Sequence, residues 1–473
     1  MTPTSHKSAA RMESARAVRK PVHERWSSPW MFILAASGAA IGFNNFWQFP
    51  SLVAQFGGGA FLVVYLLCVL LIGLPLMMTE LMLGRMGRGS PIGVFRDLAT
   101  RVRADSNWTL VGWMGVLSVF LILSYLSVIA GWTIAYTLRS ASGVFIGLTA
   151  DGMNGQFAQL VKDPEKQLFW HTFFMTATMV AAGNGVRHGV EKVMRYAMPL
   201  LAGMLMILLI YAATTDGFAQ ATELLFMPDF SKLSGLGVLS AMGHAFFSLG
   251  LGAGAMLMYG AYLGSGTQIP RLSLYVVGVD TLVGIVASLI IFSVLFAGGI
   301  DLTSGPTLVF QSLPLAFDHL PYGQFFATIF FALLVTVAWV SAIALAEPVM
   351  AWFGERFAMS ALKSALVCGI AAWALGLVSM LSFNSWAFSF KLLGVVKKLG
   401  FFDILQAVTA QVLLPLSGIL IALFAGWVLK PDTTRGELAL DSPCLHDAWL
   451  WLMRVVIPVL LVIVLISLPL LFA

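Results

Sequence analysis

The stretch from Trp30 to Leu52, WMFILAASGAAIGFNNFWQFPSL, constrains the fold more than any other part of the chain. It is apolar, and it is long enough to cross a bilayer, for which about 20 residues suffice. Its middle does not suit a helix that only spans, because Gly38 and Gly42 each weaken a helix by about 1 kcal/mol relative to alanine. Asn44 and Asn45 add side-chain amides that need partners in hydrocarbon. We therefore expect the helix to break here.

A break at membrane depth has a functional meaning. Unwound backbone is tolerated there only where it lines a cavity or is buried in protein, and its free carbonyl and N–H groups can hold a cation and an anionic group. The alternative is that Gly38 and Gly42 form a small-residue packing face against another helix.

A second interrupted stretch, Gly243 to Gly254 (GHAFFSLGLGAG), follows five apolar segments later. Two interrupted helices at corresponding positions of two five-helix halves are typical of an inverted-repeat transporter, whose site lies near the midplane between the breaks. This coincidence favours functional unwinding over simple packing.

Composition sets the class of protein. The 473 residues are 59% hydrophobic and 10% charged, which indicates an integral membrane protein and excludes a soluble enzyme. No GxxxxGK[ST] loop for ATP occurs, so transport must be passive or driven by an ion gradient. The three cysteines, Cys68, Cys368 and Cys444, have neither metal-ligand nor CxxC spacing, and we assign them no chemistry and expect no organic cofactor.

Hydropathy predicts an all-α integral membrane protein of about eleven transmembrane helices, arranged as an inverted 5+5 repeat with helices 1 and 6 broken. The expected spans are 30–52, 59–83, 110–139, 168–184, 192–213, 237–263, 271–298, 323–353, 361–382, 403–429 and 448–472. They divide the chain into an N-terminal arm (1–29), a first five-helix repeat (30–213), an outer loop (214–236), a second five-helix repeat (237–430), and a linker with helix 11 (431–473).

The loop charges predict the orientation. Lys and Arg concentrate in the N-terminal arm, in 85–103 and in 187–195, which all face the cytoplasm if the N-terminus is inside. Three lysines at 391, 397 and 398 oppose this bias. An odd number of spans then puts Ala473 outside. The net charge of +5 follows this topology rule and requires no nucleic-acid partner. The outer segment 299–321 is long enough to act as a lid.

Ionisable residues inside spans usually mark a pathway because they are costly to bury. Asp280 is the deepest of them, and its carboxylate should be accompanied by a cation or a proton. The alternative is a protonated Asp280 bonded to a backbone carbonyl. Glu80 and Glu347 lie near inner helix ends, where a solvated or capping role is as plausible as a functional one. We expect His244 to be a simple hydrogen-bond partner rather than a relay.

A sodium site needs five or six hard oxygen ligands. Suitable oxygens occur on the expected elements: the carbonyls of residues 38–41, the amide of Asn45, the hydroxyls of Ser248 and Ser341, and the carboxylate of Asp280.

Several motifs resemble the neurotransmitter:sodium symporter family in its bacterial branch. They are RWSSPWMFILAASGAAIGFNNFWQFPSLVAQFGGGAFLVVYLL, IGLPLMMTELMLGRMGRGSP, GHAFFSLGLGAGAML and DTLVGIVASLIIF, in the family's order over about residues 25–450. The resemblance implies the leucine-transporter fold, a bacterial inner (plasma) membrane location, and uptake of amino acids or related amines coupled to one or two sodium ions. The expected partners are a small solute and the bilayer; the sequence does not predict an oligomeric state.

The resemblance also implies site residues. A first sodium site would use the Ala40 carbonyl, Asn45, Ser248 and Asp280, and a second the carbonyls of Gly38, Ile41 and Val337 with the Ser341 hydroxyl. The substrate pocket would comprise Ala40, Gly42, Phe43, Asn44, Ile122, Leu126, Phe247, Gly250, Ala253, Ser341 and Leu345, with the N–H groups of Phe43 and Asn44 facing a substrate carboxylate. An inner gate would pack Arg25 and Trp26 on Tyr262, with a pairing to Glu355.

Five positions depart from the family's pattern. Gln48 replaces an arginine and Gln406 its facing aspartate, so the outer gate lacks its salt bridge. Leu126 stands where a tyrosine hydroxyl holds the substrate carboxylate, Val340 replaces an oxygen-bearing ligand of the second sodium site, and Asn44 falls at a usual glycine.

Together these features predict a sodium symporter that takes up a small organic solute by alternating access, with spans 1, 2, 6 and 7 rocking against the rest. Small residues at 250 and 253 and an apolar wall favour a hydrophobic or aromatic amino acid. Three alternatives stay open: a membrane sensor or scaffold that binds without transporting, a symporter of an amine without a carboxylate or of another solute, and proton coupling through Asp280.

Overall fold

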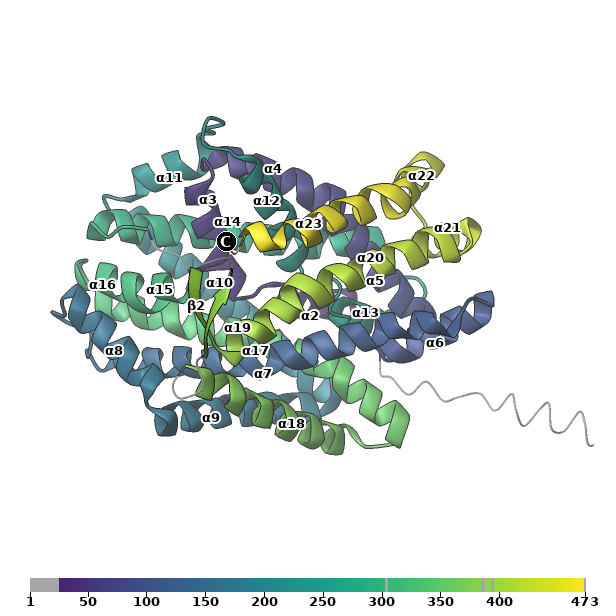
Figure 1. The fold of residues 1–473 in the computed structure, drawn as a ribbon, viewed down its shortest axis with the longest axis horizontal. Coiled ribbons are helices and arrows are strands. Elements are labelled where there is room, and N and C mark those ends of the chain that lie inside the picture. Colours follow the sequence, from purple (N-terminus) through teal and green to yellow (C-terminus); the bar gives the residue numbers. More distant parts are fainter. Residues whose placement is uncertain (1–24, 303–304, 384–387, 393–394, 472–473) are drawn as a thin grey trace, which may run out of the picture.

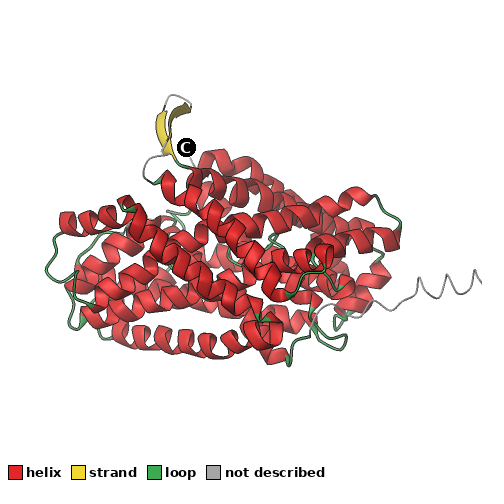
Figure 2. Ribbon diagram, turned by 90° about the horizontal axis from the view of Figure 1, so that it is seen from below, coloured by secondary structure: helices red, strands yellow, loops and turns green. Residues whose placement is uncertain are grey.

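A computed structural model describes residues 25–302, 305–383, 388–392 and 395–471 of the chain (Figure 1). Most of the predicted N-terminal arm, and the C-terminal Ala473, lie outside the described residues. The described part is a bundle of helices with one antiparallel hairpin, β1 (Phe388–Leu392) and β2 (Val395–Leu399), which stands out from the bundle in Figure 2.

Both predicted breaks are confirmed. The first span consists of α2 (Pro29–Ala40), the short turn η1 (Phe43–Asn45) and α3 (Gln48–Gln55), and the sixth of α12 (Gly235–Phe247) and α13 (Ala255–Ala261). The halves pair crosswise, since α3 packs against α12 and α2 against α13.

The remaining spans are continuous and follow the predicted order. Spans 2 to 5 are α4 (Gly59–Cys68), η2 (Val69–Gly73) and α5 (Leu74–Gly87); η3 (Ser106–Trp108) and α7 (Thr109–Ala141); α9 (Pro164–Gly183); and η4 (Val186–Val190) and α10 (Glu191–Ala213). Spans 7 to 9 are α14 (Ile269–Gly298), α17 (Gly323–Phe357) and α18 (Ala361–Ser382). Span 10 is α19 (Phe401–Gln406), η6 (Ala407–Leu413), α20 (Leu414–Leu423) and η7 (Phe424–Val428), and span 11 is α22 (Pro443–Trp451), η8 (Leu452–Val456) and α23 (Ile457–Leu471).

Short helices occupy the connections: α6 (Pro91–Val102), α8 (Ala150–Lys162), α11 (Phe218–Phe226), α21 (Pro431–Leu438), and in the predicted lid α15 (Gly305–Thr307), η5 (Leu308–Ser312) and α16 (Leu313–Asp318). Within the described residues, eight helices are long and apolar enough to cross a membrane, by length and composition. With α9 and the two broken spans they account for the predicted eleven.

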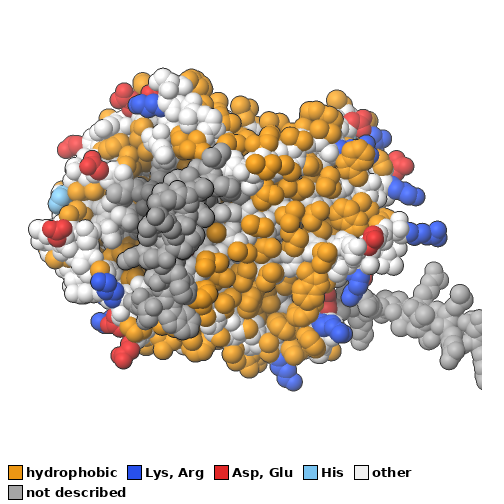
Figure 3. Space-filling model, viewed as in Figure 1, with side chains coloured by type: hydrophobic (Ala, Val, Ile, Leu, Met, Phe, Trp, Pro, Cys, Tyr) orange, Lys and Arg blue, Asp and Glu red, His pale blue; other side chains and the backbone are white. Residues whose placement is uncertain are grey.

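The surface agrees with a membrane protein. On the face shown in Figure 3, hydrophobic side chains form a broad band across the middle of the molecule, whereas charged side chains gather toward its two ends. Large apolar residues such as Ile210, Leu282 and Leu366 are about 60% exposed. Such exposure is unfavourable in water and favourable in lipid.

Local chemistry explains each break. In span 1 the N–H of Gly42 donates to the side-chain oxygen of Asn45 at 3.0 Å, and not to the carbonyl of Gly38 four residues earlier. In span 6 three alternate glycines, Gly250, Gly252 and Gly254, have φ of +62°, +77° and +78°, a region that residues with a Cβ rarely adopt. Positive φ at these positions is incompatible with a right-handed helix, so the chain is unwound between α12 and α13.

Close packing fixes the second half of span 6. A Cβ on Gly84 of α5 would lie 1.9 Å from the carbonyl oxygen of Leu257, and a Cβ on Gly260 of α13 would lie 2.5 Å from that of Leu81. The two helices therefore approach each other closely because both lack side chains at the contact.

A polar strap joins α5 to the connection before span 11. Arg85, whose side chain is 5% exposed, forms a 2.8 Å ion pair with Glu437 of α21. The same guanidinium donates to the Thr267 carbonyl at 2.7 Å. One buried arginine thus links span 2, the turn before span 7 and α21.

Candidate functional site

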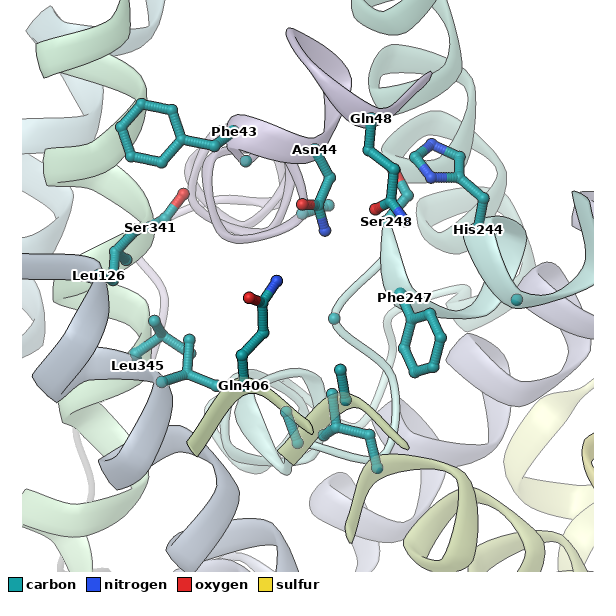
Figure 4. A pocket seen from close by; sticks show the side chains of 18 of the residues that line it. Phe43, Asn44, Gln48, Leu126, His244, Phe247, Ser248, Ser341, Leu345 and Gln406 are labelled. Atoms are coloured by element: carbon teal, nitrogen blue, oxygen red, sulfur yellow. The ribbon is translucent and has the colours of Figure 1, made fainter. Parts of the chain in front are cut away.

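The two breaks border one cavity of about 420 Å³ (Figure 4). Its wall contains every residue predicted for the substrate pocket: Ala40, Gly42, Phe43, Asn44, Ile122, Leu126, Phe247, Gly250, Ala253, Ser341 and Leu345. The wall is largely apolar, and none of its described residues is Asp, Glu, Lys or Arg. Its polar side chains are four carboxamides (Asn44, Gln48, Gln406, Gln411), four hydroxyls (Ser240, Ser248, Ser341, Tyr125), His244 and the indole of Trp47.

The cavity also has lining residues that the sequence did not single out, among them Tyr125, Phe402 and Gln411. Tyr125 lies next to the predicted Leu126, and its ring packs edge-on against Phe402 with centroids 5.6 Å apart. Its hydroxyl lies 3.5 Å from that of Thr409. No local pattern marks these residues, because the contacts join span 3 to span 10.

Asp280 lies beside the cavity and is fully buried. One carboxylate oxygen accepts from the Asn45 amide at 3.0 Å, and the other from the Ser248 hydroxyl at 2.7 Å. Neither partner is a backbone carbonyl, so the alternative of a protonated Asp280 donating to a carbonyl does not describe this arrangement. Three members of the predicted first sodium site therefore meet, and the fourth, Ala40, is the last residue of α2.

This donor set fits a cation. It combines a carboxylate, an amide and a hydroxyl, which are the hard oxygen ligands that sodium prefers. Hydrogen bonds from Asn45 and Ser248 offset only part of the cost of burying a carboxylate. Its role as an ion site stays a prediction.

Ser341 is the centre of the second predicted set. Its hydroxyl oxygen lies 2.7 Å from the carbonyl oxygen of Ile41, 3.0 Å from that of Val337 and 3.4 Å from that of Gly38. A hydroxyl has one proton to donate, so it cannot satisfy three carbonyls at once. The four oxygens therefore form a cluster with excess acceptors, which suits a cation.

Val340 lies beside this cluster without contributing an oxygen. It is fully buried, and a Cβ built on Gly38 would lie 3.4 Å from the Val340 Cβ. The structure thus places an aliphatic side chain where the resemblance implies an oxygen ligand.

Trp26 and Tyr262, two residues predicted for the inner gate, lie close together on the segment before α2 and at the end of α13. The indole N–H of Trp26 donates to the Tyr259 carbonyl at 3.1 Å, and its backbone N–H to the Tyr262 carbonyl at 3.3 Å. The Trp26 and Tyr262 rings pack edge-on with centroids 5.8 Å apart. Glu355 accepts from the N–H and the hydroxyl of Ser90. The pairing of Arg25 with Glu355 stays a prediction.

The opposite end is open. Gln48 and Gln406 are both exposed, and both side chains project toward the cavity (Figure 4). The two amides have no hydrogen bond to each other among the described contacts, and their role as an outer gate stays a prediction.

The structure decides between the roles left open for two acidic residues and corrects the prediction for His244. Glu80 is fully buried, not solvated, and it accepts from the N–H of Gly252, in the break of span 6, at 2.6 Å. Glu347 is also buried and accepts from the Tyr262 hydroxyl at 3.1 Å. His244 was expected to be a hydrogen-bond partner, but neither ring nitrogen has one among the described residues. Its ring instead stacks on Phe49. These contacts are long-range, so the local sequence did not reveal them.

Known proteins resemble the chain over most of its length. The model of the "Sodium:neurotransmitter symporter family" matches residues 23–146 and 167–472. The uncharacterised sodium-dependent transporter YhdH of Bacillus subtilis is 32% identical over 455 residues, 95% of this chain and 98% of that protein. The uncharacterised sodium-dependent transporter MJ1319 of Methanocaldococcus jannaschii is 30% identical, over 93% of this chain and 89% of its own.

Among solved structures, that of MhsT in complex with L-phenylalanine is similar, with a TM-score of 0.84 and 36% sequence identity. The match covers 94% of this chain and 99% of that chain.

Proposed function

We propose, from the fact that the chain belongs to the sodium:neurotransmitter symporter family, that it couples sodium entry to the uptake of a hydrophobic or aromatic amino acid. As a member of this family it is a sodium-dependent membrane transporter and not an enzyme. The observation that carries the substrate proposal is the cavity of about 420 Å³, apolar and free of charged lining residues, between the two breaks. Such a wall suits a zwitterion with an apolar side chain. The L-phenylalanine complex of the similar MhsT supports the same class.

Two sodium ions would travel with the substrate. The first would be held by the Ala40 carbonyl, Asn45, Ser248 and Asp280, where the buried carboxylate supplies the neutralising charge. The second would be held by the oxygen cluster around Ser341. Because both sets include residues of the broken span 1, ion binding would order the backbone that also lines the cavity.

Alternating access would move the gates in turn. The exposed Gln48 and Gln406 line the cavity, whereas the buried Trp26 does not, which supports a state that would load from the Gln48 side. We propose that this side faces outward, that the N-terminus is cytoplasmic and the C-terminus outside in a bacterial inner membrane, and that the repeats span 30–213 and 237–430. Spans 1, 2, 6 and 7 would rock against the remaining helices.

One observation bears on the alternative of an amine substrate. Asp280 would have to pair with the amine, yet it is fully buried behind Asn45 and Ser248 and does not line the cavity. This arrangement favours an ion ligand over a direct contact with substrate.

A thermal-shift screen of the purified protein tests the proposal. L-phenylalanine, L-tryptophan and L-leucine should stabilise it in sodium but not in potassium, because the ions organise the break. Phenethylamine, which lacks the carboxylate, should stabilise it little. Stabilisation by the amine alone would refute the amino-acid proposal, and stabilisation without sodium would refute coupling.

A further inference from the structure

The side-chain amide of Asn44 is a hydrogen-bond donor in the cavity wall that has no partner among the described contacts. Asn44 and Asn45 are adjacent in η1, but their amides differ in use. Asn45 donates to Asp280 twice, at 3.0 and 3.2 Å, and accepts from Gly42. The half-buried Asn44 carboxamide has no partner among the described contacts and projects from η1 into the cavity (Figure 4).

The facing wall of α7 offers no equivalent donor. Leu126 has no polar atom, and it lines the same cavity as Asn44. The neighbouring Tyr125 does carry a hydroxyl, but this lies 3.5 Å from Thr409 of span 10 while the ring packs on Phe402. On η1 itself, the Asn44 carboxamide is a side-chain donor that a carboxylate bound there can use.

Burying a carboxylate without donors is costly, and the cavity wall supplies no cationic side chain to offset the cost. A carboxamide N–H is a suitable donor, since hydrogen bonds to a charged acceptor are stronger than neutral ones.

We propose that Asn44 is a specificity-determining residue: its carboxamide donates to the substrate carboxylate and takes the place of the hydroxyl that α7 lacks at Leu126. The inference rests on the proposed function, since it requires an amino-acid substrate. It assigns to one side chain the discrimination between amino acids and derivatives in which a neutral group replaces the carboxylate.

The test compares the affinities of L-phenylalanine and L-phenylalaninamide, which differ in the carboxylate, at saturating sodium. The wild type should prefer L-phenylalanine. In Asn44→Gly the affinity for L-phenylalanine should fall by about 10- to 100-fold, as for a lost charged hydrogen bond, while that for the amide changes less than about threefold. Binding of the amide also shows that the variant is folded.

Two further variants sharpen the test. Asn44→Asp keeps the shape but repels a carboxylate, so it should reverse the preference. Leu126→Tyr in the Asn44→Gly background should restore the preference for L-phenylalanine, because it places a hydroxyl on α7 at this position. As a control, Ser293→Ala, which removes a hydroxyl that donates to the Leu289 carbonyl within α14 and does not line the cavity, should leave the ratio of affinities unchanged.

The outcomes separate the two proposals. If the wild type prefers L-phenylalanine and Asn44→Gly keeps the same ratio, the role of Asn44 is refuted and the proposed function stands. If the wild type binds the amide as tightly as L-phenylalanine, the amino-acid proposal itself fails.

Discussion

Replacing Asp280 with asparagine isolates the charge of the proposed first sodium site. The amide keeps the shape of the carboxylate: its oxygen can still accept from Asn45, and its NH₂ group can donate to the Ser248 oxygen. What disappears is one buried negative charge. Two unit charges about 4 Å apart interact by about 4 kcal/mol at an effective dielectric constant near 20.

Part of that interaction is offset, because the carboxylate loses its own hydration on burial and the amide oxygen can still coordinate an ion. We therefore expect a net loss of about 2 to 3 kcal/mol, which raises the sodium dissociation constant roughly 30- to 150-fold. Without sodium, Asp280→Asn should be at least as stable as the parent, because an uncompensated buried charge has been removed.

Sodium titration of the melting temperature at constant ionic strength measures both effects. Ser288→Ala is the matched control, since its hydroxyl donates to the Gly284 carbonyl within the same helix α14. It should leave unchanged the sodium concentration at which half of the stabilisation is reached, which we call the sodium midpoint. An Asp280→Asn protein with the parent's midpoint would refute the assignment of the carboxylate to the ion.

The other predictions concern the second ion site, the outer gate and the strap. Val340→Thr adds an oxygen beside the Ser341 cluster and should lower the sodium midpoint by about three- to tenfold; an unchanged midpoint would exclude this position from the site. The double change Gln48→Arg with Gln406→Asp should slow the reaction of a thiol reagent with a cysteine introduced into the cavity wall, in the presence of sodium and substrate, because a charged pair bonds more strongly than two amides. A labelling rate equal to that of the parent carrying the same cysteine would contradict this. Glu437→Ala, which removes a partner 36% exposed, should lower stability by about 1 to 2 kcal/mol, and Glu437→Gln should cost less in a melting experiment.

The breaks were predictable because their causes are local. Glycines at 250, 252 and 254 and the amide of Asn45 alter the backbone within a few residues, so the sequence carries the signal directly. The lining of the cavity was predictable only through the resemblance, because Ser341 reaches the carbonyls of span 1 from 300 positions away.

Other features had no signal in the sequence. The strap from Arg85 to Glu437 joins residues 352 positions apart, and both read as ordinary loop or helix-end charges. His244 was misjudged because its packing against Phe49 depends on how α3 meets α12. Such contacts arise from helix packing, which hydropathy does not predict.

Uptake of radiolabelled L-phenylalanine into proteoliposomes tests the central claim most directly. With a sodium gradient directed inward and no other gradient, the label should accumulate above its external concentration and then leave when the gradient is dissipated. A potassium or proton gradient of equal size should give no accumulation. Binding of L-phenylalanine without accumulation under a sodium gradient would contradict the account and identify a sensor instead.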